Sequence, residues 1–272
     1  MDAPRISVPM LGFFRRIVRR YFRRHFHAVR ISGAGRFAAD GGPLLVYANH
    51  SSWWDPMVCF LLAAELMPER KHYAPMDAEA LERYGILKRL GIFPVEMKTS
   101  RGAVQFLRTG ETIVTQGGVL WVTPQGRFVD ARERPLAFKP GLAALASRVA
   151  TKVGSCRVLP LAIEYPFWDE RLPETLLHFA EPVEVMAGES AEAVQERLQA
   201  ALAEAMETLQ EMAMRRDGTG FTVLRAGTLG TGGVYALGKR VAAWAGGRPY
   251  RAEHTVGATV SVARTRDGDT DA

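Results

Sequence analysis

A histidine and an aspartate, His50 and Asp55, stand five positions apart directly after a short apolar run. A neutral imidazole can take a proton from an attacking hydroxyl, and a nearby carboxylate can fix its tautomer and stabilise the cation that forms. Five residues of strand would separate the two side chains by roughly 16 Å, and five residues of helix would place them on different faces. The pair can therefore form a catalytic dyad only if the chain turns between them.

The flanking residues predict such a turn. The apolar run 43–48 is typical of a buried strand, and His50 would follow its end. Asp55-Pro56 is typical of a helix start, with an N-cap followed by a first-turn proline. The same residues allow a simpler interpretation, in which Asp55 only caps the helix and His50 only packs.

Length and composition limit the class of protein. The chain has 272 residues and 47% hydrophobic content, which is ample for the core of one large domain. Its two cysteines, Cys59 and Cys156, have neither a partner motif nor metal-ligand spacing, so we expect a reducing compartment and no role for either thiol. No apolar run approaches the roughly 18 residues of a spanning helix, and no signal-peptide core is evident, so we do not expect the chain to cross a bilayer.

Positive charge is concentrated at the N-terminus. The first 36 residues hold nine arginines and one acidic residue, although the net charge of the whole chain is only +6. On a helical projection, the arginines between positions 15 and 24 fall opposite an apolar and aromatic side. Such a helix could lie in the headgroup region of an anionic membrane, dock on the main domain, or bind nucleic acid. No base-reading motif accompanies it, so a nucleic-acid partner is not expected.

The remaining pattern alternates short apolar strands with helices, which predicts an α/β fold: a mixed β-sheet flanked by helices, with an N-terminal amphipathic basic helix. The expected strands are 43–48, 72–74, 119–123, 158–163 and 175–179, and the expected helices are 56–66, 101–115, 141–151 and a longer one after Ser190. We expect a basic membrane-association arm at 1–38, a main domain at 39–217 and a glycine-rich appendage at 218–272 whose end is disordered. Within the appendage, the stretch 234–244 could add a second membrane contact or pack on the domain.

A second segment could bind a ligand. The expected strand 119–123 runs directly into Pro124-Gln125-Gly126-Arg127. Glycine lets a ligand approach the backbone closely, and arginine offers a forked donor to an anion. The end of a strand is also where open α/β sheets place ligands. The simpler interpretation is an ordinary turn with a surface arginine.

Together these segments resemble a known family, the glycerolipid acyltransferases of the lysophosphatidic acid acyltransferase-like type, whose hallmark is His, four residues, Asp. Residues 49–56, Asn-His-Ser-Ser-Trp-Trp-Asp-Pro, match its first block nearly residue for residue. Further blocks resemble 90–93 (Leu-Gly-Ile-Phe), 124–127 (Pro-Gln-Gly-Arg), 138–141 (Phe-Lys-Pro-Gly) and 158–163 (Val-Leu-Pro-Leu-Ala-Ile). The resemblance covers roughly residues 40 to 185.

The resemblance implies transfer of a fatty acyl group from acyl-CoA or acyl-carrier protein to a hydroxyl of a membrane lipid acceptor such as lysophosphatidic acid. His50 would be the general base and Asp55 its orienting partner. The acceptor oxygen would attack the thioester directly, so neither a metal nor a cofactor is implied. An enzyme of this kind would work as a peripheral protein on the cytoplasmic face of the cell membrane, against an anionic surface.

Two blocks depart from the family pattern. Glu96 stands where the second block usually carries an arginine, and in the third block Gln125 replaces a glutamate while Phe128 replaces an arginine. The family uses these positions to hold the acceptor's phosphate or to organise the site. The substrate-binding residues expected here are Lys98, Arg101, Gln125, Gly126 and Arg127, with the cations compensating for the lost arginines. Two alternatives follow: the acceptor is a glycosylated lipid or carotenoid glycoside, or the protein is a catalytically lapsed lipid-binding member.

Overall fold

The strand expected before His50 is β2 (Leu44–Ala48), and it lies inside a nine-stranded mixed sheet. The structure is a computed structural model that describes residues 3–37 and 42–227. The strand order is β4-β3-β5-β2-β6-β7-β1-β9, and β8 pairs with β6. The other strands are β1 (Ala28–Ser32), β3 (His72–Asp77), β4 (Ile92–Val95), β5 (Val119–Val122), β6 (Ser155–Glu164), β7 (Thr175–Phe179), β8 (Val183–Met186) and β9 (Thr222–Ala226).

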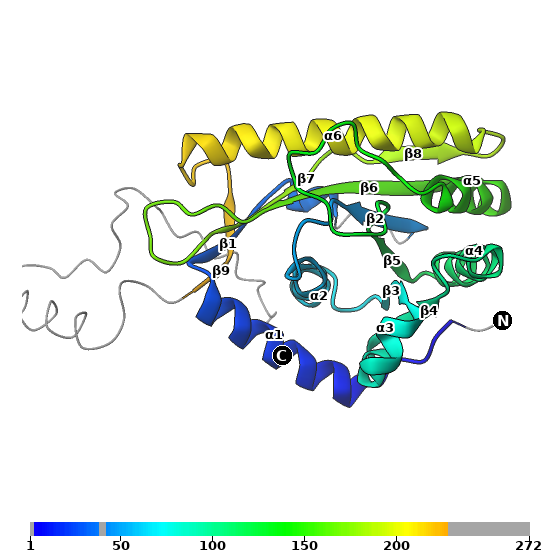
Figure 1. Ribbon diagram of the computed structural model, residues 1–272, viewed down its shortest axis with the longest axis horizontal. Coiled ribbons are helices and arrows are strands. Elements are labelled where there is room, and N and C mark those ends of the chain that lie inside the picture. The colour runs from blue at the N-terminus through cyan, green and yellow to red at the C-terminus, as the bar shows by residue number, and fades with distance from the viewer. Residues whose placement is uncertain (1–2, 38–41, 228–272) are drawn as a thin grey trace, which may run out of the picture.

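Helices cover both faces of this sheet (Figure 1). On one face lie α1 (Val8–His25) and α2 (Asp55–Leu66), and on the other lie α4 (Ser100–Thr115), α5 (Gly141–Val153) and α6 (Ala191–Arg215). The short elements are η1 (Ala34–Arg36), α3 (Ala78–Arg83) and η2 (Gly85–Leu90). Each face has its own hydrophobic core, so the predicted α/β class, a mixed sheet flanked by helices, is confirmed.

The direction of the strands decides where a site can form. Strands β4, β3, β5, β2 and β6 pair in parallel, so their carboxyl ends meet at one edge of the sheet. His50 follows β2, the block 124–128 follows β5, and Lys98 follows β4. The segments that the sequence singles out therefore share the edge at which α/β sheets bind ligands.

Four strands were not predicted, β1, β4, β8 and β9, and the first and last of them bear on the expected domain boundaries. Strand β1 lies within residues 1–38 and β9 within 218–272, yet β1 pairs with β7 in parallel and with β9 in antiparallel fashion. The boundaries at 38 and 217 therefore do not mark the edges of the sheet. The sequence of β1 is hard to interpret because it contains Arg30, whose charge is buried against Glu174 of a distant segment. The stretch 234–244 and the chain end at 265–272 lie outside the described residues.

Helix α1 docks through its apolar side on α2. Val18 and Phe22 are each only 1% exposed, and the rings of Phe14 and Phe60 lie 4.9 Å apart. Arg19 donates to Glu65 of α2 at 2.7 Å. Val18 and Phe22 on the apolar side of α1 are thus covered by protein, whereas Phe13 and Tyr21 stay exposed, as do Arg16, Arg20 and Arg24. In the described part of the chain, no helix is long and apolar enough to span a membrane.

A partly buried histidine at the start of β3 makes the stability of this fold depend on pH. The Nδ1 atom of His72 accepts a hydrogen bond from Trp121 Nε1 at 3.1 Å, and its Nε2 donates to the carbonyl of Met67 at 2.8 Å. This arrangement requires a neutral ring. Burial lowers the pKa of His72 to about 4, below the 6.5 of a free histidine.

We expect His72 to favour folding at neutral pH and to lose this effect in acid. The unfolded chain binds more protons than the folded one between about pH 4 and 6.5, so the contribution is complete above pH 6.5 and falls by about 3 kcal/mol as the pH drops to 4. Urea unfolding of wild type and His72→Gln at pH 7 and pH 4.5 isolates the effect. Equal pH dependence in both proteins would contradict it.

Candidate active site

The turn between β2 and α2 brings the predicted dyad together. The Nδ1 atom of His50 lies 2.9 Å from Oδ2 of Asp55. The structure therefore confirms that the side chains of His50 and Asp55 meet across a turn. Because an ionised carboxylate can only accept, Nδ1 carries the proton, and the second ring nitrogen, Nε2, is left with a lone pair able to accept one.

The carboxylate of Asp55 is buried, with 1% of the residue exposed, and three donors satisfy it. Besides His50, the backbone N–H of Ser52 donates to Oδ2 at 2.9 Å and the hydroxyl of Tyr165 donates to Oδ1 at 2.7 Å. The N-cap residue of α2 is Trp54, and the Asp55 carboxylate bonds to His50, Ser52 and Tyr165, so the interpretation of Asp55 as a mere N-cap is wrong. A buried carboxylate needs such donors because an unpaired buried charge is costly.

Tyr165 is a site residue that the sequence analysis missed. It follows β6, the strand beside β2, so its position after a neighbouring parallel strand was the available signal. Burial and the charge of Asp55 raise the pKa of its hydroxyl, which keeps the hydroxyl protonated and able to donate. The three side chains form a chain of hydrogen bonds from Tyr165 through Asp55 to His50.

Two neighbouring strands hold the turn in place. The amide of Asn49 bonds both backbone groups of Ile163 in β6, donating to its carbonyl at 3.0 Å and accepting from its N–H at 2.8 Å. On the β5 side, Gln125 accepts from the backbone N–H of His50 at 3.1 Å, and the N–H of Val129 donates to the carbonyl of His50 at 2.8 Å. Gln125 thus holds the backbone of His50, whereas a contact with substrate was expected.

The rest of the third block is arranged around His50 in a way that the sequence did not predict. The ring of Phe128 lies 4.3 Å from the His50 ring, centroid to centroid. Nη2 of Arg127 donates a hydrogen bond to Oε1 of Glu133 at 3.0 Å. Gly126 adopts a positive φ of 65°, and a methyl group there would come within 2.7 Å of the Lys139 side chain, so that lysine packs against the turn.

Lys98 and Arg101 lie at the same sheet edge but well away from the dyad. They follow β4, and strands β5 and β3 stand between β4 and β2, which corresponds to roughly 14 Å at the usual strand spacing. Glu96 accepts from the hydroxyl of Thr99 at 2.9 Å, next to the start of α4. Neither of the two predicted cations is brought to His50.

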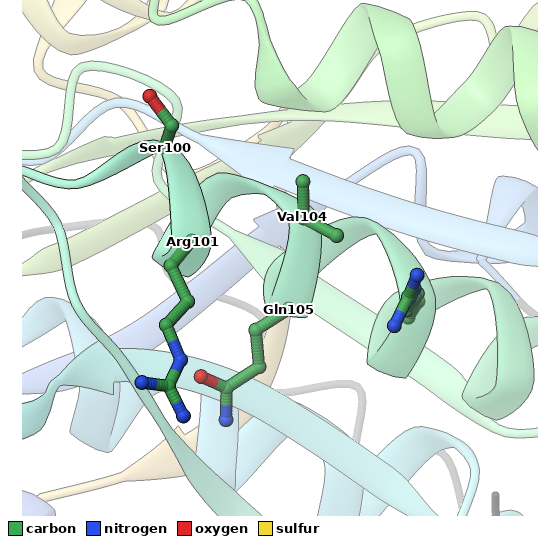
Figure 2. A pocket seen from close by; sticks show the side chains of 5 residues that line it. Ser100, Arg101, Val104 and Gln105 are labelled. Carbon is green, nitrogen blue, oxygen red and sulfur yellow. The ribbon is translucent and has the colours of Figure 1, made fainter.

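A hollow of about 550 Å³ lies along the outer side of α4. It is lined by Ser100, Arg101, Val104, Gln105 and Arg108. Figure 2 shows Arg101 and Gln105 extending to the same side of this helix. The dyad does not line this hollow, and the hydrogen-bond geometry around His50 marks the candidate active site.

The nearby thiol does not offer a nucleophile. Burial, with a smaller effect of the Asp55 charge, raises the pKa of Cys59, so the thiol stays protonated. The hydroxyl of Ser52 accepts from the N–H of Trp54 at 3.2 Å and supports the turn. Among these groups, Nε2 of His50 is the one left able to accept a proton.

Comparison with known proteins identifies the family. A family model described as acyltransferase matches residues 28–164. This chain belongs to the acyltransferase family. No curated protein matches the sequence significantly. Among solved structures, the 1-acyl-sn-glycerophosphate (LPA) acyltransferase PlsC from Thermotoga maritima has a similar fold, with 18% identity, a TM-score of 0.54 and coverage of 74% of this chain and 80% of that chain.

The protein is accordingly an acyltransferase enzyme with a glycerolipid acyltransferase-like fold. The matched range begins at β1, so the family domain includes a strand that the sequence analysis assigned to the arm. It ends at the last residue of β6, one position before Tyr165.

Proposed function

We propose that this acyltransferase moves a fatty acyl group from the thioester of acyl-CoA or acyl-carrier protein to a hydroxyl of a membrane lipid, with His50 as general base. The observation that carries the proposal is the 2.9 Å contact between His50 Nδ1 and a buried, fully bonded Asp55 carboxylate. That contact leaves Nε2 to accept the acceptor's proton.

The reaction proceeds in two proton movements. His50 Nε2 removes the proton of the acceptor hydroxyl as its oxygen attacks the thioester carbonyl, and Asp55 stabilises the imidazolium that forms. The tetrahedral intermediate then collapses, the carbon–sulfur bond breaks, and the imidazolium returns the proton to the departing thiolate. Tyr165 acts as a positioning residue, since it holds the second oxygen of Asp55.

Membrane association is part of the proposal. Arg16, Arg20 and Arg24 of α1 are exposed, and each arginine near an anionic surface contributes about 1 kcal/mol. Acceptor and product are both lipids, so an enzyme held at the surface meets them without extracting them. We propose a peripheral position on the cytoplasmic face of the cell membrane.

The surroundings of His50 favour an acceptor without a phosphate monoester beside the reacting hydroxyl, such as a glycosylated lipid. Phe128, an apolar ring, covers the imidazole, and Arg127, the next residue along the chain, donates a hydrogen bond to Glu133. Lys139, a further cation at this block, packs on Gly126. A phosphate next to His50 would face an aromatic ring where a forked donor would serve it better.

Acceptor-dependent thiol release tests the proposed function. Purified protein is incubated with acyl-CoA or acyl-carrier protein and each of lysophosphatidic acid, monoacylglycerol and a glycosylated lipid alcohol, and products are identified by mass spectrometry. We expect thiol release that requires an acceptor, together with an acylated lipid. No release with any combination would instead favour a catalytically lapsed, lipid-binding protein.

The acceptor preference is tested by Phe128→Arg. Lysophosphatidic acid and monoacylglycerol differ only in the phosphate, and wild type is expected to prefer the neutral one. A new arginine can contribute about 1.5–3 kcal/mol to a charged hydrogen-bonded contact, so the ratio of kcat/KM values should shift toward lysophosphatidic acid by about 10- to 100-fold.

Tyr84→Arg is the matched control, because Tyr84 is as exposed as Phe128, at 59% against 58%, and lies at the end of α3. It should leave the ratio unchanged. A tenfold wild-type preference for lysophosphatidic acid would contradict the proposal that the acceptor is neutral. It would point to Lys139 as the partner of the phosphate.

A further inference from the structure

Exposed aromatic side chains are concentrated around the dyad. In the described ranges 3–37 and 42–227, six Phe, Tyr or Trp residues are exposed: Phe13, Tyr21, Trp53, Tyr84, Phe128 and Phe167. Scattered exposed apolar residues are normal in proteins, but a cluster at one place marks an interaction site. Three of the six lie at the dyad and two on α1, which leaves only Tyr84 elsewhere.

The three residues at the dyad come from three different loops. Trp53 lies in the turn between His50 and Asp55, and the Phe128 ring touches His50. Phe167 is two positions after Tyr165, which spans at most about 7 Å of chain. These loops follow β2, β5 and β6, so Trp53, Phe128 and Phe167 form an aromatic rim at the edge of the sheet where His50 lies.

An arginine stripe adjoins this rim. The rings of Tyr21 and His25, at the end of α1, lie 6.3 and 5.5 Å from that of Trp54, and Trp54 contacts Trp53 at 5.4 Å. Arg16, Arg20 and Arg24 are exposed and recur every four residues, so they share one side of α1. The rim thus has cationic side chains next to it.

We infer that the aromatic rim and the arginine stripe together dock the mouth of the active site onto an anionic bilayer. This inference rests on the proposed function. It states which surface of the proposed membrane-associated acyltransferase meets the bilayer and how the protein is oriented there. Aromatic side chains favour the headgroup level of a bilayer, and arginines favour its phosphates. The acceptor's hydroxyl then reaches His50 from the membrane side. Val18 and Phe22, the buried apolar residues of α1, take no part.

Fluorescence of Trp53 measures the contact directly. Vesicles of phosphatidylcholine and phosphatidylglycerol are prepared with brominated acyl chains, which quench tryptophans that enter the bilayer. We expect strong quenching of wild type and loss of most of it in Trp53→Phe, because the other described tryptophans are at least half-buried. Equal quenching in both proteins, or no quenching of wild type, would overturn the inference.

A pair of double variants tests the energetics. Trp53→Ser/Phe167→Ser removes two rim residues, and Tyr84→Ser/Met214→Ser removes two residues of matched exposure elsewhere: 63% and 66% against 59% and 66%. We expect the rim variant to bind anionic vesicles at least tenfold more weakly and the control to bind like wild type. Equal weakening in both variants, or none in either, would overturn the inference.

Activity on two forms of acceptor separates this inference from the proposed function. The rim variant should retain its activity on a short-chain, monomerically dispersed acceptor. Its activity on a lipid with the same headgroup embedded in vesicles should fall at least tenfold. If wild type acylates neither form, the proposed function fails. If wild type acylates both forms and the rim variant acylates both equally well, only the inference about the rim fails.

Discussion

Replacing His50 by alanine is expected to lower kcat/KM for acyl transfer by at least about 100-fold, because a positioned general base typically contributes 10²- to 10⁴-fold. The imidazole is the group whose Nδ1 is held by Asp55, and the described residues offer no second histidine in contact with that carboxylate. Acceptor-dependent thiol release, measured with a saturating acyl donor, reports the loss.

His25→Ala is the matched control, since it removes an exposed imidazole from α1, close to Trp54 but outside the dyad. It should retain activity on a dispersed acceptor. Circular dichroism on both variants establishes that they are folded. Activity of His50→Ala within tenfold of wild type would mean that His50 is not the base.

Replacing Asp55 by asparagine is expected to lower kcat/KM for acyl transfer at least as much as the His50→Ala change does. An amide can donate its N–H to Nδ1 of His50, which would force the ring proton onto Nε2, the nitrogen that must accept. The corresponding Asp-to-Asn change in serine proteases costs about 10⁴-fold for this reason, and we expect a loss on the order of 10³- to 10⁴-fold here. The measurement is again kcat/KM for acyl transfer.

Tyr165→Phe separates the tautomer effect from simple loss of a contact. It removes the 2.7 Å bond to Asp55 but leaves the carboxylate facing Nδ1, so the tautomer is preserved and the loss should be far smaller. If Asp55→Asn and Tyr165→Phe reduce kcat/KM equally, Asp55 acts by holding the turn and not by setting the proton on His50.

The dyad was predictable because its geometry is local. An apolar run ending two residues before His50 and a proline directly after Asp55 set a strand, a turn and a helix in immediate succession, and backbone stereochemistry limits how such a turn closes. The strand expected at 175–179 was found as β7 with the same bounds, because its consecutive apolar residues are buried on both faces of the sheet.

Other elements were hidden because their stability comes from distant partners. Strand β1 contains Arg30, which appeared to belong to a basic arm; it is buried by a 2.9 Å bond to Glu174, 144 positions away. The amphipathic pattern of α1 was evident, but the pattern is the same for a helix on a bilayer and a helix on a protein. Only the tertiary contact between Phe14 and Phe60 shows that α1 packs on α2.

The sequence by itself determined that His50 and Asp55 stand across a strand–turn–helix junction in an α/β acyltransferase fold. Only the tertiary structure decided that Tyr165 completes the carboxylate's bonding, that Phe128 covers the base while Glu133 engages Arg127, and that Lys98 and Arg101 lie three strands away. The physical reason is the range of the interactions: turn and helix signals act over a few bonds, whereas strand order brings together side chains that no local pattern connects.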